Sequence, residues 1–408
     1  MTPVVKPHDM GQQYPAPVHS PPSKALKIKS AKTFTYWVDI VGACNLRCPS
    51  CPRGNFTPND VVLAPPDAGL MKFDLFKDIL RKIKDDGPSL NPQVHLYSWG
   101  EPLLHPEVAK FVEYTLDQGF YCGLSANLNY VKTLRDVVKA GPDFFRLSLS
   151  GFHQEVYSQT HTRGDIERVK TNMRKLRQYM TEFDKTIYVE VNYHVYKHNA
   201  GDDLEKMIEF CNELRFHIGP VWALYMPLEK NLELLKGNIS AEDQKLMDLY
   251  AIPPKRAMEL AMPHRDTSTC SVREKATVIS FDGSVPLCCN TFDKAHTVAK
   301  SFLDISHDDL QRIRLEHSYC GPCMDAGLHT VLTFEAGEVM DVEGNKVLRE
   351  IDNPLEIHQY SKPRVVSREK GPLPILAKPE EELSTRRKVR GLWAWPYYLS
   401  SLASRLGG

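Results

Sequence analysis

Strand-like segments alternate with helical segments between residues 34 and 226, and this alternation constrains the fold more than any other feature. Strands separated by helices pair in parallel through right-handed crossovers. The predicted strands are Phe34–Val41, Val94–Ser98, Tyr121–Ser125, Phe144–Ser148, Ile187–Tyr196 and Val221–Met226, and the predicted helices are Lys72–Lys84, Pro106–Gln118, Val131–Ala140, Asp165–Thr181 and Asp203–Glu213. We therefore expect an α/β fold whose six strand–helix units form an open or partly closed barrel, with active residues at the carboxyl ends of the strands.

The segments that flank this region differ from it in composition. Residues 1–32 contain six prolines, which interrupt regular structure and predict a mobile arm. Lys275–Leu287 alternates apolar and polar residues around Asp282-Gly283, which predicts a β-hairpin. The predicted division is an arm at 1–32, the barrel at 33–230, a helical connector at 231–265, a small hairpin-containing domain at 266–335, and an extension at 336–408 whose pattern predicts no particular fold.

Charge and hydropathy exclude some classes of function. Lysine and arginine total 51, as do aspartate and glutamate, so the formal net charge of the 408 residues is zero. A surface that coats nucleic acid needs a basic excess, so we expect no nucleic-acid partner. No apolar run reaches the ~18–20 residues that a membrane span requires, and no secretion signal is visible. We therefore expect a cytoplasmic protein.

The ten cysteines are clustered, and in a reducing cytoplasm such clusters bind metal more often than they form disulfides. Seven of them fall in three groups, and three stand apart. The groups are Cys44, Cys48 and Cys51, then Cys288 and Cys289, then Cys320 and Cys323, while the isolated cysteines are Cys122, Cys211 and Cys270.

The first group has the spacing Cys44-x3-Cys48-x2-Cys51 and begins where the first predicted strand ends. Three thiolates on one loop can hold one inorganic cluster and leave a fourth metal position open, as catalysis requires. The alternative is a zinc site that a remote histidine or cysteine completes. The second predicted strand is followed by a Gly-Glu-Pro sequence at residues 100–102.

These two motifs, in this order and at these strand ends, resemble those of the radical S-adenosylmethionine (SAM) enzymes. The resemblance covers roughly residues 34–230 and implies the partial (β/α)6 barrel of that family. It implies that Cys44, Cys48 and Cys51 bind three irons of a [4Fe–4S] cluster, that SAM chelates the fourth iron, and that Gly100, Glu101 and Pro102 receive the SAM amino group. The family usually has a second glycine where this chain has Trp99, so the local shape is expected to differ there.

The same resemblance suggests further contacts to SAM and a type of chemistry. Ser125, Asn127, Ser148, Ser150 and Asn192 lie at or near later strand ends, where the family places polar contacts to SAM, although each could equally be an ordinary strand-end or capping residue. In this family the reduced cluster cleaves SAM to methionine and a 5′-deoxyadenosyl radical. The radical then removes a hydrogen atom from an unactivated carbon.

The later cysteines form a second pattern, Cys270-x12-Gly283-x4-Cys288 followed by Cys320-x2-Cys323. This region resembles the twitch domain, a shortened SPASM domain that some radical SAM enzymes carry. The resemblance implies one auxiliary [4Fe–4S] cluster with Cys270, Cys288, Cys320 and Cys323 as ligands, since Cys288 fits the motif spacing and its neighbour Cys289 does not. Four thiolates also suit structural zinc, so that alternative stays open.

A cluster without an open iron cannot readily coordinate substrate, so it more plausibly accepts an electron from a substrate radical. We therefore expect a radical SAM oxidoreductase that acts on a small hydroxylated molecule, such as a polyol, an amino sugar or a nucleoside, in natural-product or carbohydrate biosynthesis. A flavodoxin or ferredoxin would supply electrons. The alternatives are a peptide-modifying maturase, which the short proline-rich arm disfavours, a redox-neutral epimerase or lyase with a thiol as hydrogen donor, and a metal-stabilised binding protein without catalysis.

The C-terminal extension contains a basic run at residues 386–390, followed by the aromatic residues Trp393, Trp395, Tyr397 and Tyr398. Basic residues beside tryptophan and tyrosine are typical of segments that contact a membrane surface, so weak peripheral attachment is one interpretation. The interpretation that we favour is an aromatic strap packed on the barrel.

Overall fold

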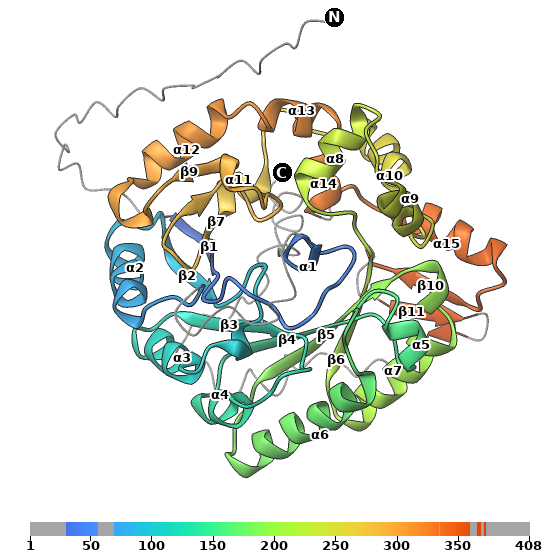
Figure 1. The fold of residues 1–408 in the computed structure, drawn as a ribbon, viewed down its shortest axis with the longest axis horizontal. Helices are drawn as coiled ribbons and strands as arrows, with labels where there is room; N and C mark the ends of the chain where they lie inside the picture. The colour runs from blue at the N-terminus through green and yellow to red at the C-terminus, as the bar shows by residue number, and fades with distance from the viewer. Residues whose placement is uncertain (1–29, 56–68, 334, 360–364, 369–370, 373–408) are drawn as a thin grey trace, which may run out of the picture.

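The computed structural model describes residues 30–55, 69–333, 335–359, 365–368 and 371–372 (Figure 1). Most of the predicted arm and the whole basic, aromatic segment near the C-terminus lie outside these residues, so both predictions stay open. Within the described part of the chain, no helix combines the length and the apolar character that crossing a membrane requires.

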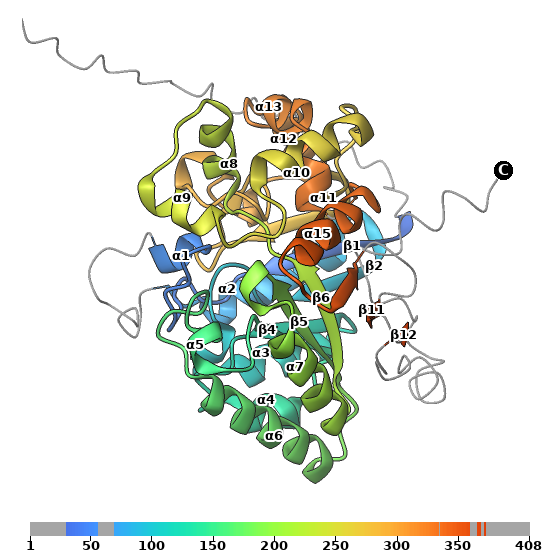
Figure 2. The same ribbon diagram turned by 90° about the vertical axis from the view of Figure 1, so that its right-hand side faces the viewer.

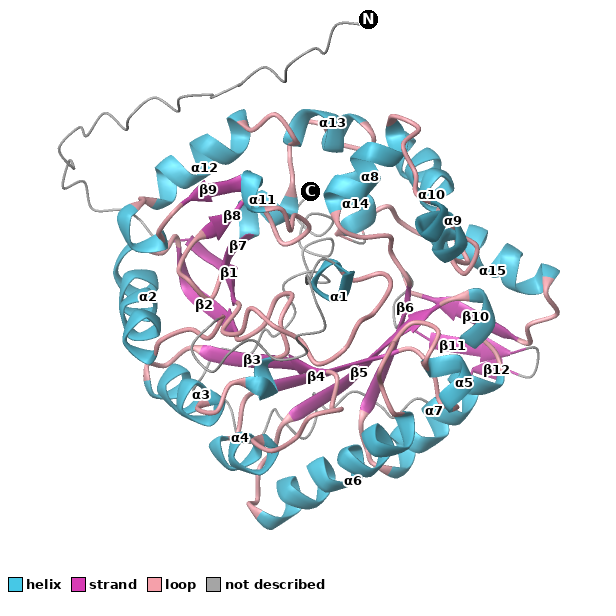
Figure 3. Ribbon diagram, viewed as in Figure 1, coloured by secondary structure: helices cyan, strands magenta, loops and turns pink. Residues whose placement is uncertain are grey.

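Seven parallel strands form the main sheet, which confirms the predicted α/β fold. They are β1 (Ser30–Val38), β2 (Ser89–His95), β3 (Tyr121–Ala126), β4 (Phe144–Leu149), β5 (Tyr188–Val195), β6 (His217–Trp222) and β7 (Ala276–Ile279). Their order across the sheet is β6-β5-β4-β3-β2-β1-β7. Figure 3 shows the sheet curving around one side of the molecule, with helices outside it and further helices closing the opposite side.

Helices near the predicted positions cover the outer face of this sheet. They are α2 (Phe73–Asp86), α3 (Val108–Asp117), α4 (Leu134–Ala140), α6 (Ile166–Glu182) and α7 (Asp202–Glu213), with the short α1 (Pro52–Asn55), α5 (Gln154–Tyr157), η1 (Pro102–Leu104) and η2 (Lys197–Asn199) in the loops between. Helix α2 buries Phe76, Ile79, Leu80 and Ile83, which recur at helical spacing on one side. Asp165 caps helix α6, because its side chain accepts a hydrogen bond from the Arg168 amide at 2.9 Å.

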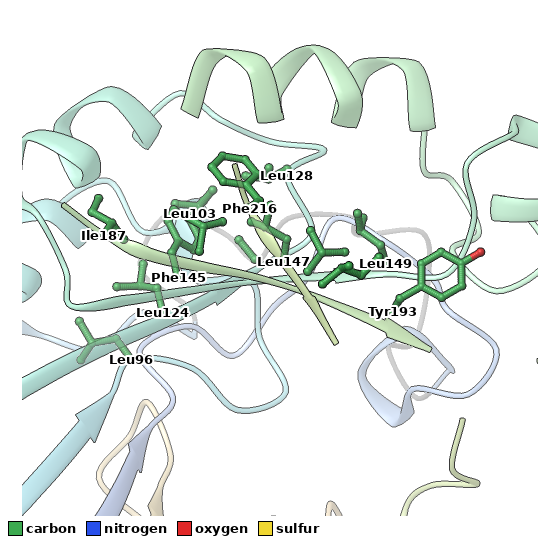
Figure 4. Packing of buried hydrophobic residues seen from close by; sticks show 14 of the residues in the cluster. Leu96, Leu103, Leu124, Leu128, Phe145, Leu147, Leu149, Ile187, Tyr193 and Phe216 are labelled. Carbon is green, nitrogen blue, oxygen red and sulfur yellow. The ribbon is translucent and has the colours of Figure 1, made fainter. Parts of the chain in front are cut away.

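The two faces of the sheet differ in character. In strand β4, Phe145, Leu147 and Leu149 are fully buried and belong to the hydrophobic core between the sheet and its helices, part of which Figure 4 shows. Arg146 and Ser148 alternate with them and remain partly exposed. Because β4 lies in the middle of the sheet, this exposure means that side chains do not fill the opposite face. We call that opposite face of strands β2–β6 the inner face.

The prediction of a β-hairpin at residues 275–287 is wrong for its first strand. The turn forms, because the Ser280 amide donates to the Ser284 carbonyl at 2.8 Å and Gly283 has a φ of +83°. The first arm, however, is β7, which pairs in parallel with β1, while β8 (Val285–Pro286) pairs with β9 (Thr297–Ala299). All four residues of β7 are buried, a pattern typical of parallel strands covered on both faces and unlike the alternation of a hairpin.

The remaining elements follow the barrel. They are α8 (Leu228–Leu235), α9 (Ala241–Met247), α10 (Pro254–Ala261), η3 (Met262–His264), α11 (Ser271–Lys275), η4 (Lys294–His296), η5 (Phe302–Asp304), α12 (His307–Glu316), α13 (Cys320–Asp325), α14 (Leu328–Leu332), α15 (Val339–Glu350), β10 (Leu355–His358), β11 (Val365–Arg368) and β12 (Gly371–Pro372). Part of the C-terminal extension is thus folded, and it docks on strand β6. The indole Nε1 of Trp222 donates to the Asp341 carboxylate at 2.9 Å, and the Trp222 amide donates to the Gln359 side chain at 2.7 Å.

This docking predicts an effect of Gly344→Ala. A Cβ at residue 344 would lie 2.5–2.8 Å from three ring atoms of the fully buried Trp222, so helix α15 would have to move away from β6. We expect the free energy of unfolding, measured by urea denaturation, to fall by about 1–3 kcal/mol. Val342→Ala on the same helix is the control, because Val342 is 66% exposed and its truncation should change stability by less than about 0.5 kcal/mol. Equal losses for both variants would contradict the close packing.

Candidate active site

The three cysteines of the first group lie on one loop at the carboxyl ends of the strands. The loop follows β1 and leads into α1, which lies on the same side of the molecule as α5, the helix that follows β4 (Figure 2). It is held by hydrogen bonds from the Cys51 amide to the Cys48 carbonyl and from the Arg47 amide to the Thr162 carbonyl, both of 3.0 Å. Burial raises the pKa of the Cys48 thiol, and the neighbouring thiols of Cys51 and Cys44 raise it further. The loop therefore gathers three soft sulfur ligands, a donor set that can hold one iron–sulfur cluster with an open iron.

The Gly-Glu-Pro segment packs directly beneath this loop. A Cβ at Gly100 would lie 1.7 Å from the Val41 carbonyl oxygen, so only glycine fits there. The Glu101 amide donates to the Ala43 carbonyl at 2.9 Å, next to Cys44 in sequence. The loop after β2 is thus fixed against the loop after β1 by backbone contact.

Asp39 holds the same junction from below, and the sequence analysis did not identify it. Its buried carboxylate accepts hydrogen bonds from the Trp99 amide at 3.1 Å and the Gly100 amide at 3.3 Å. Burial raises the pKa of this carboxyl to about 6, although these amides oppose the shift. The signal in the sequence is an aspartate in the middle of the apolar run Trp37–Val41, near the end of the first predicted strand.

Glu101 connects the segment to the end of β3. Its Oε1 accepts a hydrogen bond from the Leu103 amide at 3.2 Å and its Oε2 accepts one from the Asn127 amide at 2.8 Å. Burial raises the pKa of this carboxyl to about 7. Pro102 begins helix η1, which Glu101 caps. That Gly100, Glu101 and Pro102 receive the SAM amino group stays a prediction, and the structure adds that both Glu101 oxygens already accept backbone hydrogen bonds.

Asn127 reaches the cysteine loop with its side chain. Its Nδ2 donates to the Asn45 Oδ1 at 3.0 Å and lies 3.7 Å from the Cys44 sulfur. Hydrogen bonds to ligand sulfurs are one means by which proteins tune cluster potentials. The structure therefore places Asn127 beside the cysteine loop, together with Asn45, which was not predicted. That Asn127 contacts SAM stays a prediction.

The other predicted SAM contacts fall into two groups. Ser125, Ser148 and Asn192 are partly exposed on the inner face, where Ser148 and Asn192 are paired in register. Ser150 is fully buried, and its hydroxyl contacts the Thr160 hydroxyl and, at 2.6 Å, the His161 Nδ1. Three of these side chains are thus available to a ligand, whereas the Ser150 hydroxyl is engaged within the protein.

The second cysteine pattern also converges in space. Cys270, Cys288, Cys320 and Cys323 line one cavity, together with Leu228, Val272, Leu287, Met324 and Leu332. Cys289 faces elsewhere and packs beside Trp37, Ala276 and Val278, as does Tyr97. The placement of Cys288 rather than Cys289 in the cavity agrees with the motif spacing. Four thiols around one cavity suit either a [4Fe–4S] cluster or zinc.

A buried arginine lies beside these four cysteines, and the sequence analysis did not identify it. Arg314 is almost fully buried and donates from Nη1 to the Ala276 carbonyl at 2.9 Å and to the Thr277 hydroxyl at 3.3 Å. Burial lowers its pKa to about 10, against the opposing influence of the nearby thiols, so it stays charged at neutral pH. Its backbone carbonyl lies 3.2 Å from the Cys320 sulfur. This positive charge would stabilise a centre ligated by four thiolates.

Trp99 connects the two cysteine sites. Its indole Nε1 donates to the Thr291 carbonyl at 3.2 Å, and its ring lies 6.0 Å from the Phe292 ring in an edge-on arrangement. The Arg53 guanidinium, two residues after Cys51, lies 4.8 Å from the centre of that same Phe292 ring. The departure from the expected glycine therefore supplies a contact between the motif after β2 and the segment that follows Cys288 and Cys289.

Comparison with protein families agrees with this geometry. Residues 38–211 match the model of the radical SAM superfamily. The match covers less than half of the 408 residues. The family implies a [4Fe–4S] cluster and SAM as its cofactors. Among curated proteins, this chain is 26% identical over 216 residues to a probable GTP 3′,8-cyclase of Methanocaldococcus jannaschii and 24% identical over 204 residues to one of Methanococcus vannielii. These matches cover 52% and 49% of this chain but only 65% and 61% of the relatives, less than two thirds of either.

Solved structures with a distantly similar fold include three that contain, or were crystallised with, SAM. The first is anSMEcpe with bound AdoMet, at 13% identity and a TM-score of 0.44, which covers 71% of this chain and 82% of that one. The second is Streptococcus suis SuiB bound to S-adenosylmethionine, at 14% identity and a TM-score of 0.45, which covers 74% of this chain and 68% of that one. The third is BtrN in complex with AdoMet and 2-DOIA, at 14% identity and a TM-score of 0.40, which covers 74% of this chain and 90% of that one.

The cavity predicts that two adjacent cysteines differ in their effect on metal content. Cys288→Ala should remove about four irons per chain after anaerobic reconstitution, the content of one cubane cluster, because Cys288 lines the cavity. Cys289→Ala should leave the iron content unchanged. Iron and sulfide analysis measures both variants. Loss of iron from Cys289→Ala with retention in Cys288→Ala would contradict the assignment, and loss of zinc instead of iron would identify a zinc site.

Proposed function

We propose that this protein is a radical SAM oxidoreductase that oxidises a small hydroxylated molecule, such as a polyol, an amino sugar or a nucleoside. The observation that carries the proposal is the convergence of Cys270, Cys288, Cys320 and Cys323 on one cavity. A cluster with four protein thiolates has no open iron, which suits it to accept an electron rather than to bind substrate. The reaction would belong to natural-product or carbohydrate biosynthesis.

The residues of the barrel would hold the cofactors. Cys44, Cys48 and Cys51 would ligate the first [4Fe–4S] cluster, and Gly100, Glu101 and Pro102 would receive the SAM amino group. Together these cofactors supply one-electron chemistry that removes a hydrogen atom from an unactivated carbon. Asn127 would donate a hydrogen bond to the Cys44 sulfur, since its Nδ2 is already 3.7 Å away. Ser125, Ser148 and Asn192 would contact SAM or substrate from the inner face.

The second site would hold the electron acceptor. Its lining combines apolar residues with polar ones, and Arg314 would balance part of the thiolate charge. The apolar residues are Leu228, Val272, Leu287, Met324 and Leu332, and the polar ones are Arg273, Asn290, Arg314 and His329. Trp99 and Phe292 keep this site in contact with the first. A flavodoxin or ferredoxin would deliver electrons to the first cluster. The two archaeal relatives are named as GTP cyclases, and GTP contains a nucleoside. Their names therefore support a nucleoside among the substrates proposed here.

One observation favours a second candidate, a redox-neutral radical SAM reaction. Cys289 packs beside Trp37 and Tyr97 rather than in the four-cysteine cavity. Trp37 pairs with His95 in the barrel, so a thiol at this place could return a hydrogen atom to a substrate radical. Cys122 and Cys211 are fully buried in the hydrophobic core and are not placed for such a role.

Cleavage of SAM tests the proposed function. We expect anaerobically reconstituted protein to contain about eight irons per chain and to form 5′-deoxyadenosine from SAM after reduction with dithionite. The triple variant Cys44→Ala, Cys48→Ala, Cys51→Ala should lose this activity by more than about 1,000-fold, because it lacks every ligand of the first cluster. The quadruple alanine variant of the second site should still cleave SAM. A protein that contains zinc without iron, or that never forms 5′-deoxyadenosine, contradicts the proposal.

Solvent deuterium separates the two candidates. Each compound that stimulates 5′-deoxyadenosine formation would be converted in D2O, where cysteine thiols carry deuterium. Oxidation predicts a product two hydrogens lighter, without carbon-bound deuterium, and unchanged yield with Cys289→Ser. The redox-neutral reaction predicts a deuterated product and its loss in Cys289→Ser. Mass spectrometry of the product distinguishes these outcomes, and Cys211→Ser serves as the matched control.

A further inference from the structure

The inner strands of the barrel contain one cation and one anion, and these face each other. Arg146 is the only lysine or arginine in strands β2–β6, all of which are described, and Glu190 is their only aspartate or glutamate. The two residues pair in register on the neighbouring strands β4 and β5. Their side chains lie 3.9 Å apart, measured from the Arg146 Nε to the Glu190 Oε1. The chain has 51 basic and 51 acidic residues, yet strands β2–β6 contain only this one charged pair. Its presence there therefore needs an explanation.

The pair lies below the cysteine loop on the inner face. Ser125 on β3 is opposite Arg146 in register, and Asn127 follows Ser125 by two residues, just beyond the end of β3. Asn127 is the residue whose amide lies 3.7 Å from the Cys44 sulfur. Since a strand rises about 3.3 Å per residue, Arg146 lies roughly 7 Å from the level of Asn127, toward the amino ends of the strands. A molecule held between them would be within reach of both.

Part of the Arg146 side chain is accessible, whereas that of Glu190 is not. The Arg146 side chain is 31% exposed although it lies on a central strand, and the Glu190 side chain is 3% exposed. The Arg146 guanidinium carbon lies 5.4 Å from the centre of the Phe144 ring. The Phe144 ring and the Glu190 carboxylate therefore both hold the guanidinium in place. A ligand that enters from the strand ends therefore meets the positive charge first.

The neighbouring polar groups are neutral. Burial lowers the pKa of His95 to about 3 and that of His194 to about 4, and the charge of Arg146 contributes to both shifts. The His194 Nε2 lies 3.1 Å from the Asn192 Nδ2. His95 is 4% exposed, and neither of its ring nitrogens has a hydrogen-bond partner among the described residues. A buried polar group without a partner indicates a bound water or ligand group.

We propose that Arg146 binds an anionic group of the substrate, a carboxylate or a phosphate, while Asn192 and His194 contact its hydroxyls. A guanidinium can donate two parallel hydrogen bonds to either anion, which fixes orientation as well as affinity. Glu190 is a positioning residue, because it is buried behind Arg146 and reaches the ligand only through it. The inference rests on the proposed function, since that function makes the inner face the substrate site, and it narrows the substrate to an acidic hydroxylated molecule.

Matched sugars test this inference without requiring turnover. Binding of glucose, glucuronate and glucose 6-phosphate to the full-length, reconstituted protein with SAM would be measured by anaerobic calorimetry. We expect glucuronate or glucose 6-phosphate to bind at least tenfold more tightly than glucose, and the stronger of the two identifies carboxylate or phosphate. Arg146→Gln should remove that preference, Arg146→Lys should retain part of it, and Glu190→Gln should weaken it less than Arg146→Gln does. Arg135→Gln is the control, because Arg135 pairs with Glu182 on the outer helices.

Three outcomes would overturn the inference. The first is that neither anionic sugar binds better than glucose. The second is that the preference for the anionic sugar persists in both Arg146 variants. The third is that Arg146→Gln weakens the binding of SAM instead, which would assign the guanidinium to the SAM carboxylate. Formation of 5′-deoxyadenosine by the unmodified protein is measured separately. Failure of that activity contradicts the proposed function, whereas failure of the sugar preference contradicts only the acidic substrate.

Discussion

The close approach of Gly100 to the Val41 carbonyl is the contact on which the rest of the site depends. Any side chain at residue 100 would separate the loop after β2 from the loop after β1. With glycine there, Asp39 can accept both amide hydrogens of Trp99 and Gly100, and Glu101 can reach the Asn127 amide. Asn127 in turn places its side chain beside Cys44. One backbone contact thus orders three successive strand ends around the cysteine loop, and the buried Asp39 carboxylate stabilises it from below.

The sequence predicts the barrel because each strand and helix carries its own pattern. Helix α2 buries four residues at helical spacing, and strand β4 alternates core residues with Arg146 and Ser148. Strand β7 is the exception, because it has only four residues, all of them buried, and a turn follows it. A local pattern cannot distinguish a hairpin arm from an added parallel strand. The difference is decided by β1, more than 200 residues earlier, whose edge β7 covers.

The sequence predicts site residues where a motif fixes their spacing, but not where a residue's partners are distant in the chain. The cysteines and the Gly-Glu-Pro segment are local motifs, and the structure gathers them. Arg314 could not be predicted, because its role depends on Ala276 and Thr277, which belong to another element. Ser148 and Ser150 look equivalent in sequence, yet only Ser148 remains accessible, because Ser150 lies beyond the end of β4, where Thr160 and His161 enclose its hydroxyl. Strand-end position alone therefore does not identify ligand contacts.

The polar inner face and the link through Trp99 follow from the same physical requirement. A barrel filled with apolar side chains would be more stable, but it would leave no space beside the cysteine loop. Here the core lies between the sheet and its outer helices, so the inner face can contain Arg146, Glu190 and His95. The sheet does not close between its edge strands β6 and β7, and the region from α8 to α15 covers that gap (Figure 1). Trp99 fastens this covering region to the motif after β2, so the segment that closes the barrel also holds the second cysteine site against the first.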